Sequence, residues 1–499
     1  MQAFGPGEVF LIAPTTGATG RLRGAAVALR CHLMGALVLA VLAGCAADPA
    51  LSPHETLPSQ QDLVQRFNLE TAHAPALPSA TWWTVYQDPE LDRWIERGLA
   101  DNPGMHEAAA RATRARAGFE SARAAQGLTV GAGASVNDQR ISGTGFYPPP
   151  FANEIFAQKD IWLSGSIDFD VFGRLHARSD AALLGAQAEA IDRENARIRL
   201  AAAIAHAYFE LAHAQRSLAV LTELEQSRAQ MLDLVRTRVQ AGFDTQVDRR
   251  LAEIPVPQIH VDIEKMRERI ALARHSLAVM AGQPPEAADA VDARLPEGAA
   301  LEVPQSVPAD LLSRRADVSA ARDRALSALR GVDAARDDFY PNVNLTALVG
   351  FDTVETSQFF KWPSRVWQIE PAIHLPLFDS GLLKASLKGA SADADAAISA
   401  YNAAVLQAVG EASDALASIA AVKRQREEQD RATASAQAAS DLAGVRYQAG
   451  LGNLLAVVSA QASVLSQRLS QVDLAARSAA LNVDLALALG GGFDAVASR

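Results

Sequence analysis

A five-residue motif that occurs twice constrains the fold of this chain more than any other feature of its sequence. Arg238-Val239-Gln240-Ala241-Gly242 is matched 208 positions later by Arg446-Tyr447-Gln448-Ala449-Gly450. Each copy ends a long alanine-rich stretch of helical character, and a second such stretch follows it. An internal repeat of this size predicts a chain that folds as two similar halves.

The helical stretches are unusually long. Between Gly173 and Gly242 only Gly185 interrupts the pattern, and a continuous helix of about 70 residues would reach roughly 100 Å. Apolar residues recur in heptads along it, at Ile204, Ala207, Leu211, Ala214, Leu218, Leu221, Leu232, Val235 and Val239. Glu225 and Arg228 interrupt this seam with one polar heptad. A helix of this length suits a structure that crosses the periplasm rather than a compact globule.

The helix that returns after Gly242 carries Pro255 and Pro257 in its interior. Proline removes a backbone donor and clashes with the preceding turn, so we expect a kink or an interruption there.

In four shorter segments apolar and polar residues alternate, which is typical of strands with one apolar face. They predict strands at about 128–137, 161–170, 342–351 and 366–375. Nine to eleven residues is about the length that crosses a bilayer obliquely. Four strands cannot close a barrel, and lipid does not tolerate open sheet edges, so several copies must each contribute four strands. The number of strands is compatible with either two or three copies.

The first 44 residues are typical of an export signal. Arginines precede an apolar run, Leu33 to Leu42, that is too short to span a bilayer. Leu42-Ala43-Gly44-Cys45 resembles a bacterial lipobox, so we predict a signal peptide at 1–44 and a covalent lipid on Cys45. An ordinary signal with an incidental cysteine is the alternative. The Pro-, Ser- and Ala-rich residues 45–80 predict an extended tether.

The rest of the chain divides into a first repeat (81–285), a linker (286–307), a second repeat (308–492) and a tail (493–499). The net charge of -11 argues against nucleic acid as a partner. The sequence contains no Gly-rich phosphate loop, no Gly-x-Ser-x-Gly and no His-Glu-x-x-His. We therefore expect that the protein is not an enzyme and that it carries no cofactor other than the lipid on Cys45.

Several short motifs occur in a fixed order along the mature chain. After the lipobox they are Asp170–Arg174, Asp310–Asp317, Phe339–Pro341, Leu375–Asp379, Arg446–Gly450 and Leu489–Gly492. Because of the order of these motifs and the internal repeat, the chain resembles the TolC-like outer-membrane factors, specifically the efflux lipoproteins of NodT type. It departs from that family at Ala316, where proline is common, and at Asn453–Val457, which lacks an aspartate.

The resemblance implies a mainly α fold, internally duplicated, with a membrane β-barrel contribution of four strands per protomer and long coiled-coil helices. It implies a homotrimer with a twelve-stranded barrel in the lipid of the outer membrane and a twelve-helix tunnel through the periplasm. It further implies a duct that exports small molecules such as drugs. The partners that it implies are a periplasmic adaptor and an inner-membrane pump, usually of resistance-nodulation-division type.

The two Gln-Ala-Gly turns are expected to lie together at the periplasmic tip. Arg238, Asp244 and Asp248 lie near one turn, and Arg446 and Tyr447 near the other. In several copies these carboxylates would form rings that repel one another unless Arg or Tyr holds them. We hypothesise that Arg446 and Tyr447 bond to Asp244 or Asp248 and keep the duct shut. Solvated helix-end charges that contribute little are the alternative.

Three other interpretations stay open. His206, Glu210 and His213 share one helix face and resemble half of a di-metal site, but the other Glu-x-x-His, Glu70 to His73, falls in the tether. A purely structural periplasmic coiled coil would explain the helices but not the four strands. The same duct could also serve a secretion system.

Overall fold

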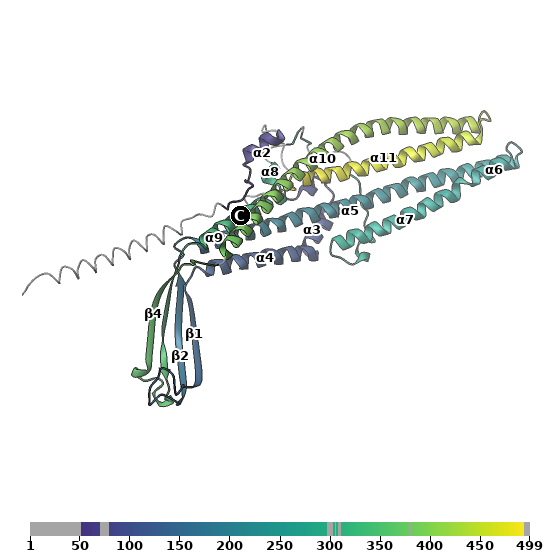
Figure 1. The fold of residues 1–499 in the computed structure, drawn as a ribbon. Coiled ribbons are helices and arrows are strands. Elements are labelled where there is room, and N and C mark those ends of the chain that lie inside the picture. Colours follow the sequence, from purple (N-terminus) through teal and green to yellow (C-terminus); the bar gives the residue numbers. More distant parts are fainter. Residues whose placement is uncertain are drawn as a thin grey trace, which may run out of the picture.

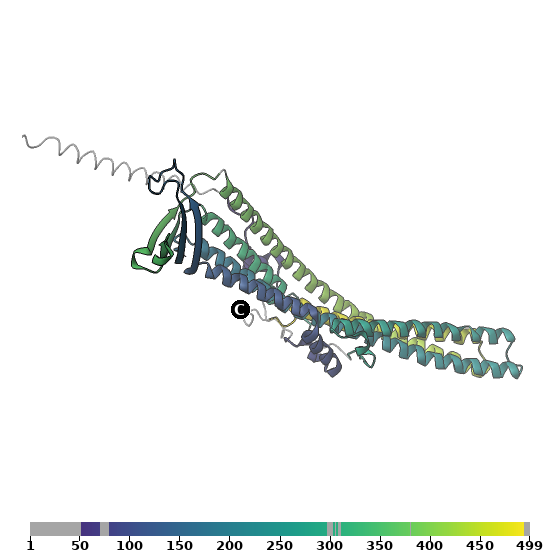
Figure 2. The ribbon, with the colours of Figure 1, turned by 90° about the horizontal axis from the view of Figure 1, so that it is seen from below.

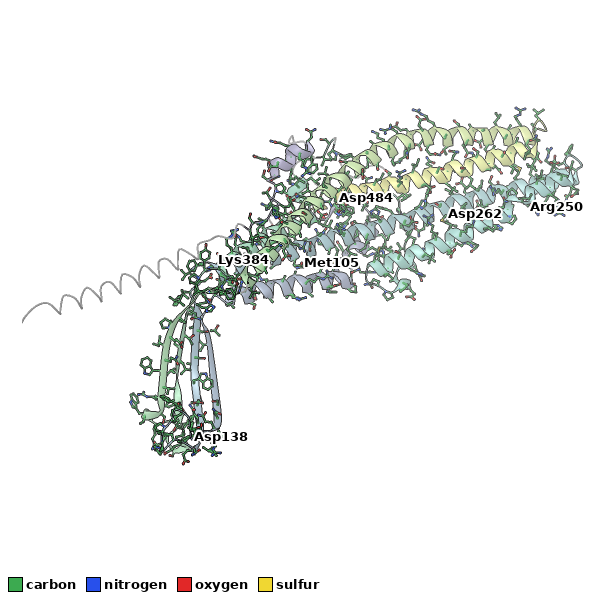
Figure 3. The ribbon with its side chains drawn as sticks, in the orientation of Figure 1. Met105, Asp138, Arg250, Asp262, Lys384 and Asp484 are labelled. Carbon is green, nitrogen blue, oxygen red and sulfur yellow. The ribbon has the colours of Figure 1, made fainter. Side chains whose placement is uncertain are left out.

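The computed structural model describes residues 51–69, 79–296, 303–304, 306–307, 311–379 and 381–493. These residues form a long rod of helices that carries a small β-sheet at one end (Figure 1). Arg250 lies near the helical tip of the rod, and Asp138 lies on the sheet at the opposite end (Figure 3). The predicted signal peptide, Cys45 and the tail beyond Phe493 lie outside the described residues.

The rod is built from two helical hairpins, one from each half of the chain. The helices of the first half are α3 (Pro89–Asp101), α4 (Pro103–Ala124), α5 (Arg174–Gln240), α6 (Gln246–Glu253) and α7 (Pro255–Met280). Those of the second half are α8 (Leu311–Arg314), α9 (Ala316–Asp337), α10 (Leu382–Gln448) and α11 (Leu454–Ala488). Both α5 and α10 have 67 residues. The two hairpins turn at the same end of the rod (Figures 1 and 2).

The prolines of the returning helix interrupt it as expected. Helix α6 ends at Glu253, and α7 begins at Pro255. The polar heptad of α5 faces this break: Arg228 donates to the carbonyl oxygen of Pro255 at 2.9 Å, and His260 of α7 lies 2.8 Å from the Glu225 carboxylate. The polar interruption of the apolar seam therefore coincides with the interruption of the neighbouring helix.

Alanine replaces the expected proline at the start of α9 without disturbing the helix. Ala316 is the first residue of α9 and is buried. Proline is favoured at this position because the N–H that it lacks has no partner within the helix. Alanine, the best helix former, fits the same place.

The sheet contains β1 (Thr129–Arg140), β2 (Ile155–Asp168), β3 (Asn342–Thr353) and β4 (Arg365–His374), all antiparallel in the order β1-β2-β3-β4. Strand β2 differs most from the prediction of 161–170. It begins at Ile155, because β2 pairs with β1 as far as Arg140. Apolar and polar residues do not alternate cleanly in this first part of β2, so the sequence pattern did not indicate it. Strand β2 ends early because Asp170 adopts a left-handed backbone (φ 46°).

The two faces of the sheet differ in polarity. Directly paired residues share a face. One face is apolar: Val130, Ala132, Ala134, Val136, Ile161, Leu163, Val343, Leu345, Ala347, Val349, Phe351, Trp367, Ile369 and Ile373. The other is mostly polar: Ser135, Asn137, Gln158, Asp160, Ser164, Ser166, Thr346, Asp352, Gln368 and Glu370. Trp162 is an exception on the polar face, where it packs so closely over Gly133 that a Cβ would lie 2.5 Å from its ring.

The predicted N-terminal tether contains a docked helix, so the prediction of an extended tether is wrong for this part. Helix α2 (Gln60–Phe67) begins with a capping box in which Ser59 and Asp62 bond reciprocally. Leu63 and Leu69 are buried against Val318 of α9 and other residues of α9 and α10. The capping box was the signal for this helix in the sequence.

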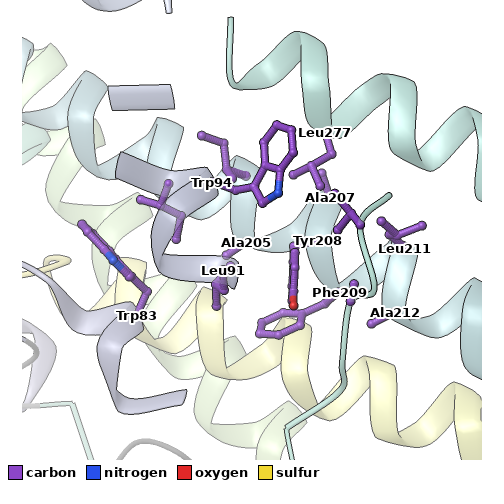
Figure 4. Packing of buried hydrophobic residues seen from close by; sticks show 14 of the residues in the cluster. Trp83, Leu91, Trp94, Ala205, Ala207, Tyr208, Phe209, Leu211, Ala212 and Leu277 are labelled. Atoms are coloured by element: carbon purple, nitrogen blue, oxygen red, sulfur yellow. The ribbon is translucent and has the colours of Figure 1, made fainter. Parts of the chain in front are cut away.

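The largest apolar core lies midway along the rod, where α3 packs against α5 (Figure 4). The 3-10 turn η1 (Trp82–Tyr86) and α3 supply Trp82, Trp83, Leu91, Trp94 and Ile95, and α5 supplies Tyr208, Phe209 and Leu211. The Tyr208 hydroxyl donates to Asp88 at 2.6 Å. This core holds the start of the first repeat against its long helix.

Candidate functional site

Both hairpins turn in the same way at the tip, and the repeated motif explains why. Gly242 and Gly450 have left-handed backbones, with φ of 78° and 76°. The N–H of Phe243 donates to the Arg238 carbonyl at 2.9 Å, and that of Leu451 to the Arg446 carbonyl at 2.8 Å. These are Schellman motifs, which end a helix where glycine can adopt positive φ.

Each returning helix starts with a side-chain cap. Asp248 bonds to the Thr245 N–H at 2.8 Å and to its hydroxyl at 2.7 Å in a capping box at the start of α6. Asn453 accepts from the Ala456 N–H at 2.9 Å at the start of α11. The predicted gate residue Asp248 is therefore engaged within its own helix.

Asp244 joins the two turns. Its carboxylate accepts from Arg238 Nε at 2.9 Å and Nη2 at 3.2 Å. It also accepts a short hydrogen bond from the Tyr447 hydroxyl of the other hairpin. The Arg238 guanidinium carbon lies 4.6 Å from the centre of the Tyr447 ring, a distance that permits a cation–π interaction. We call Arg238, Asp244 and Tyr447 the tip cluster.

Apolar packing supports the tip cluster from the side of the rod. Tyr447 is only 2% exposed and packs with Leu232, Val235, Ala252, Leu454 and Val457 from both hairpins. The ring of Tyr447 is therefore fixed by packing while its hydroxyl reaches Asp244. A hydrogen bond between two fixed groups loses little conformational freedom on forming.

The protonation states suit these contacts. The hydrogen bond from Arg238 is the main cause that lowers the pKa of Asp244, so this carboxylate is ionised at neutral pH. Burial, followed by the bond to Asp244, raises the pKa of Tyr447 to about 12, so its hydroxyl keeps the proton that it donates. The cluster thus combines one anion, one cation and one neutral donor.

The arginine of the tip cluster is Arg238 rather than the predicted Arg446. The Arg446 side chain is exposed and forms no ion pair with the part of the chain that the structure describes. Arg446 and Tyr447 are neighbours on α10 and point to different sides, so only Tyr447 reaches Asp244 within one chain. Sequence alone did not distinguish the two arginines, which occupy the same position in the two motifs.

The histidines that resembled half of a metal site each have a separate partner. His206 Nε2 lies 3.0 Å from Asp484, and His213 Nε2 lies 2.6 Å from Asp473. Glu210 is paired with Arg269 of α7 at 2.6 Å. No group of three or more possible metal ligands occurs among the described residues. These side chains link α5 to α11 and α7.

Polar contacts between the hairpins also occur farther from the tip, and they were not expected from the sequence. Gln461 of α11 donates to Ser227 of α5 at 3.3 Å, and Arg468 is paired with Glu223 at 2.6 Å. No sequence motif marks these residues, because their partners are more than 200 positions away.

Comparison with known proteins places the chain in a family. The family model described as outer membrane efflux protein matches residues 94–283 and 307–491, one segment in each half. The fusaric acid resistance protein FusA of Burkholderia cepacia is 34% identical over 369 residues, which cover 72% of this chain and 70% of FusA. The multidrug resistance outer membrane protein MdtP of Escherichia coli K12 is 29% identical over 489 residues, which cover 94% of this chain and 97% of MdtP.

The fold agrees with this assignment. The outer membrane protein VceC of Vibrio cholerae superimposes with a TM-score of 0.79 and 31% identity, covering 84% of this chain and all of VceC. The open-state MtrE channel of Neisseria gonorrhoeae gives a TM-score of 0.75 and 26% identity over 88% of this chain and 98% of MtrE. The chain belongs to the outer membrane efflux protein family, and it is the outer-membrane channel component of an efflux system.

Proposed function

We propose that three copies of this chain form a continuous duct, with a twelve-stranded barrel in the outer membrane and a helical tunnel in the periplasm. The observation that carries this proposal is the sheet with one apolar and one polar face. Within the described chain, β1 and β4 each pair on one side only. A single sheet of this kind leaves edges that lipid does not tolerate, and joining copies edge to edge removes them.

Helix α10 supports the assembly of several copies. It alone among the described helices contains a window long and apolar enough to cross a membrane, and 28% of that window is buried. Its composition is dominated by alanine, which lets helices approach closely. A neighbouring copy would cover this surface of α10.

The number of strands favours three copies over two. Eight strands give a barrel filled by its side chains, whereas twelve leave room for a channel.

The mass and shape of the extracted protein test this proposal. Full-length protein extracted from membranes in mild detergent is expected to be a trimer with a rod roughly 100 Å long, since 67-residue helices have this length. It should form ion-conducting pores in planar bilayers. A monomer, or an assembly that does not conduct even when Asp244 is replaced with asparagine, would exclude the duct.

We also propose that Cys45 carries a lipid in the periplasmic leaflet. Leu51 packs near Val332, Ala335 and Leu387, which lie at the ends of α9 and α10 next to the sheet. Leu51 is six positions after Cys45, and a segment of this length spans at most about 20 Å. Cys45→Ser should abolish palmitate labelling; labelling that persists would refute the anchor.

The tip cluster is the proposed latch of the closed duct. Asp244 ties the two hairpins of one protomer together, and the exposed Arg446 is free to contact a neighbouring copy. Opening would require the hairpins to separate, which breaks the bond between Tyr447 and Asp244. Asp248 is proposed to act through the α6 cap, by fixing the start of the returning helix.

The proposed partners are a periplasmic adaptor at the helical tip and an inner-membrane pump of resistance-nodulation-division type. The names of the relatives concern resistance to fusaric acid and to multiple drugs. We therefore propose small organic toxicants as the exported molecules. Deleting the gene should increase sensitivity to such compounds, and only a gene with an intact lipobox and tip should restore resistance fully.

A further inference from the structure

The apolar face of the sheet ends in basic residues at its outer rim, the end farthest from the helices. Arg140 pairs with Ile155, Lys159 with Val136 and Thr353, and Arg365 with Phe351. The register places all three basic residues on the same face as the apolar band. We call Arg140, Lys159 and Arg365 the basic rim.

Acidic residues at the same level lie mainly on the opposite face. Asp160 accepts from Ser135 at 2.7 Å, and Gln158 donates to Asp160 at 3.3 Å and to Asp352 at 3.1 Å. Asp138 is the acidic strand residue that shares the face of the basic rim. Charges therefore differ between the two faces of the sheet. The charged groups on the apolar face are mainly basic, and those on the polar face are carboxylates.

The two arginines of the basic rim are available to a ligand. Arg140 and Arg365 are exposed, and neither forms an ion pair with any described residue. Lys159 is half-buried and donates to the carbonyl oxygens of Ala157 and Val354, both at 3.2 Å. Two or three cations on the lipid side of a membrane strand need an anion that is itself part of the membrane.

Aromatic residues adjoin the basic rim at the same height. Trp362 and Trp367 are 76% and 75% exposed, and the Arg365 guanidinium lies over the Trp362 ring. Tryptophan is enriched where a membrane protein meets the boundary between hydrocarbon and headgroups. The tryptophans therefore place the basic rim at the headgroup level of the outer leaflet.

We propose that the basic rim binds the phosphate groups of lipopolysaccharide in the outer leaflet. The occupant follows from charge complementarity: phosphates on a lipid match exposed arginines at the edge of an apolar face. Arginine suits this task because its planar guanidinium can bond two phosphate oxygens at once. This inference rests on the proposed barrel, in which the apolar face contacts lipid.

The experiment titrates detergent-solubilised full-length trimers with deep-rough lipopolysaccharide and obtains the apparent Kd by native mass spectrometry. The same lipid stripped of its phosphates, and phosphatidylglycerol, are titrated in parallel. The test variant is Arg140→Gln with Arg365→Gln. The control is Arg114→Gln with Arg123→Gln, which removes two exposed arginines from α4 in the periplasmic part of the rod.

We expect the test variant to bind lipopolysaccharide about 30-fold more weakly than the wild type, since each basic residue near an anionic surface contributes a factor of about five. The control variant should bind lipopolysaccharide like the wild type. The wild type should bind the dephosphorylated lipid as weakly as the test variant binds intact lipopolysaccharide. Unchanged affinity in the test variant, or equal affinity for phosphatidylglycerol, would overturn the proposal.

The basic rim and the duct fail in different ways. Protein that is monomeric, or that does not conduct even as the Asp244→Asn variant, contradicts the duct itself. Trimers that conduct normally but bind lipopolysaccharide independently of Arg140 and Arg365 contradict only the basic rim. Arg365→Lys keeps the charge but cannot bond two phosphate oxygens at once, so it should bind lipopolysaccharide more tightly than the test variant and less tightly than the wild type.

Discussion

At the scale of single residues, Asp244 organises the tip because its carboxylate accepts hydrogen bonds from Arg238 of one hairpin and Tyr447 of the other. Arg238 and Asp244 belong to the same turn, so their ion pair orients the carboxylate within one hairpin. Tyr447 then joins the other hairpin to this prepared acceptor. From the sequence we expected Arg446 and Tyr447 to bond to Asp244 or Asp248; the structure has Tyr447 and Arg238 on Asp244.

Replacing Asp244 with asparagine should loosen the proposed latch at the tip. The change removes the charge-assisted bonds from Arg238 and Tyr447, and bonds to a charged group typically contribute about 1.5–3 kcal/mol. We expect open events in single-channel recordings to become at least about tenfold more frequent, since about 1.4 kcal/mol corresponds to that factor. Asp233→Asn, which breaks an exposed pair with Arg236 on α5, is the control and should keep the low conductance.

The proposed latch should also respond to acid, and the direction of the response follows from the lowered pKa of Asp244. Its pKa is lowered in the folded protein, chiefly by the hydrogen bond from Arg238. A lowered pKa contributes stability that is fully present above the unfolded value, about 3.9, and is lost as the pH falls through the folded value. Conductance of the wild type should therefore stay low from neutral pH to about pH 4 and rise below it. The Asp244→Asn variant should lack this step; an identical step in both would assign it to another group.

At the scale of elements, the ends of the helices could be predicted better than their contacts. Glycine in a Schellman motif and a heptad seam are local signals, so the ends of α5 and α10 follow from Gly242 and Gly450. The start of β2 could not be predicted, because the β1 ladder rather than alternation sets it. Helix α2 was missed because a Pro-rich surrounding sequence concealed its capping box and the spacing of Leu63 and Phe67.

The left-handed glycine of the second tip turn gives a prediction about its element. A Cβ at Gly450 would meet nothing within 4 Å, so Gly450→Ala adds no clash but forces alanine into positive φ. The expected cost is about 1–2 kcal/mol, confined to the end of α10. Hydrogen exchange of amides 445–455 should become faster. Gly444→Ala, at a helical glycine with equal space, should slow exchange or leave it unchanged.

Docking of α2 can be tested by proteolysis. Leu63 is 2% exposed, and truncation of a buried leucine generally costs about 2–5 kcal/mol. Leu63→Ala should therefore detach α2 from α9 and α10 and make residues 59–68 sensitive to limited proteolysis in the full-length protein. Gln61→Ala, which changes an exposed side chain of the same helix, should stay as resistant as the wild type.

At the scale of the whole molecule, the order of the strands links the two halves. The halves look separable in the sequence, because each has its own strands, long helix and returning helix. The structure pairs β2 of the first half with β3 of the second in a single sheet, from Lys159–Thr353 to Asp168–Asn344. The repeat predicted two halves of similar structure, but it contained no information on which strands of the two halves would pair.

This central pairing has a consequence for biogenesis. The chain between the end of β2 and the start of β3 includes the whole first hairpin, so joining them closes a loop of more than 170 residues. Contacts with so large a sequence separation form late, after local helices and hairpins. A chain that emerges N-terminus first has therefore built most of its helices before β3 and β4 exist. Until β3 and β4 are made, the β1–β2 hairpin has an exposed apolar face and an unpaired edge. If the sheet joins the proposed barrel, we expect the incomplete chain to need chaperones that cover this hairpin before assembly.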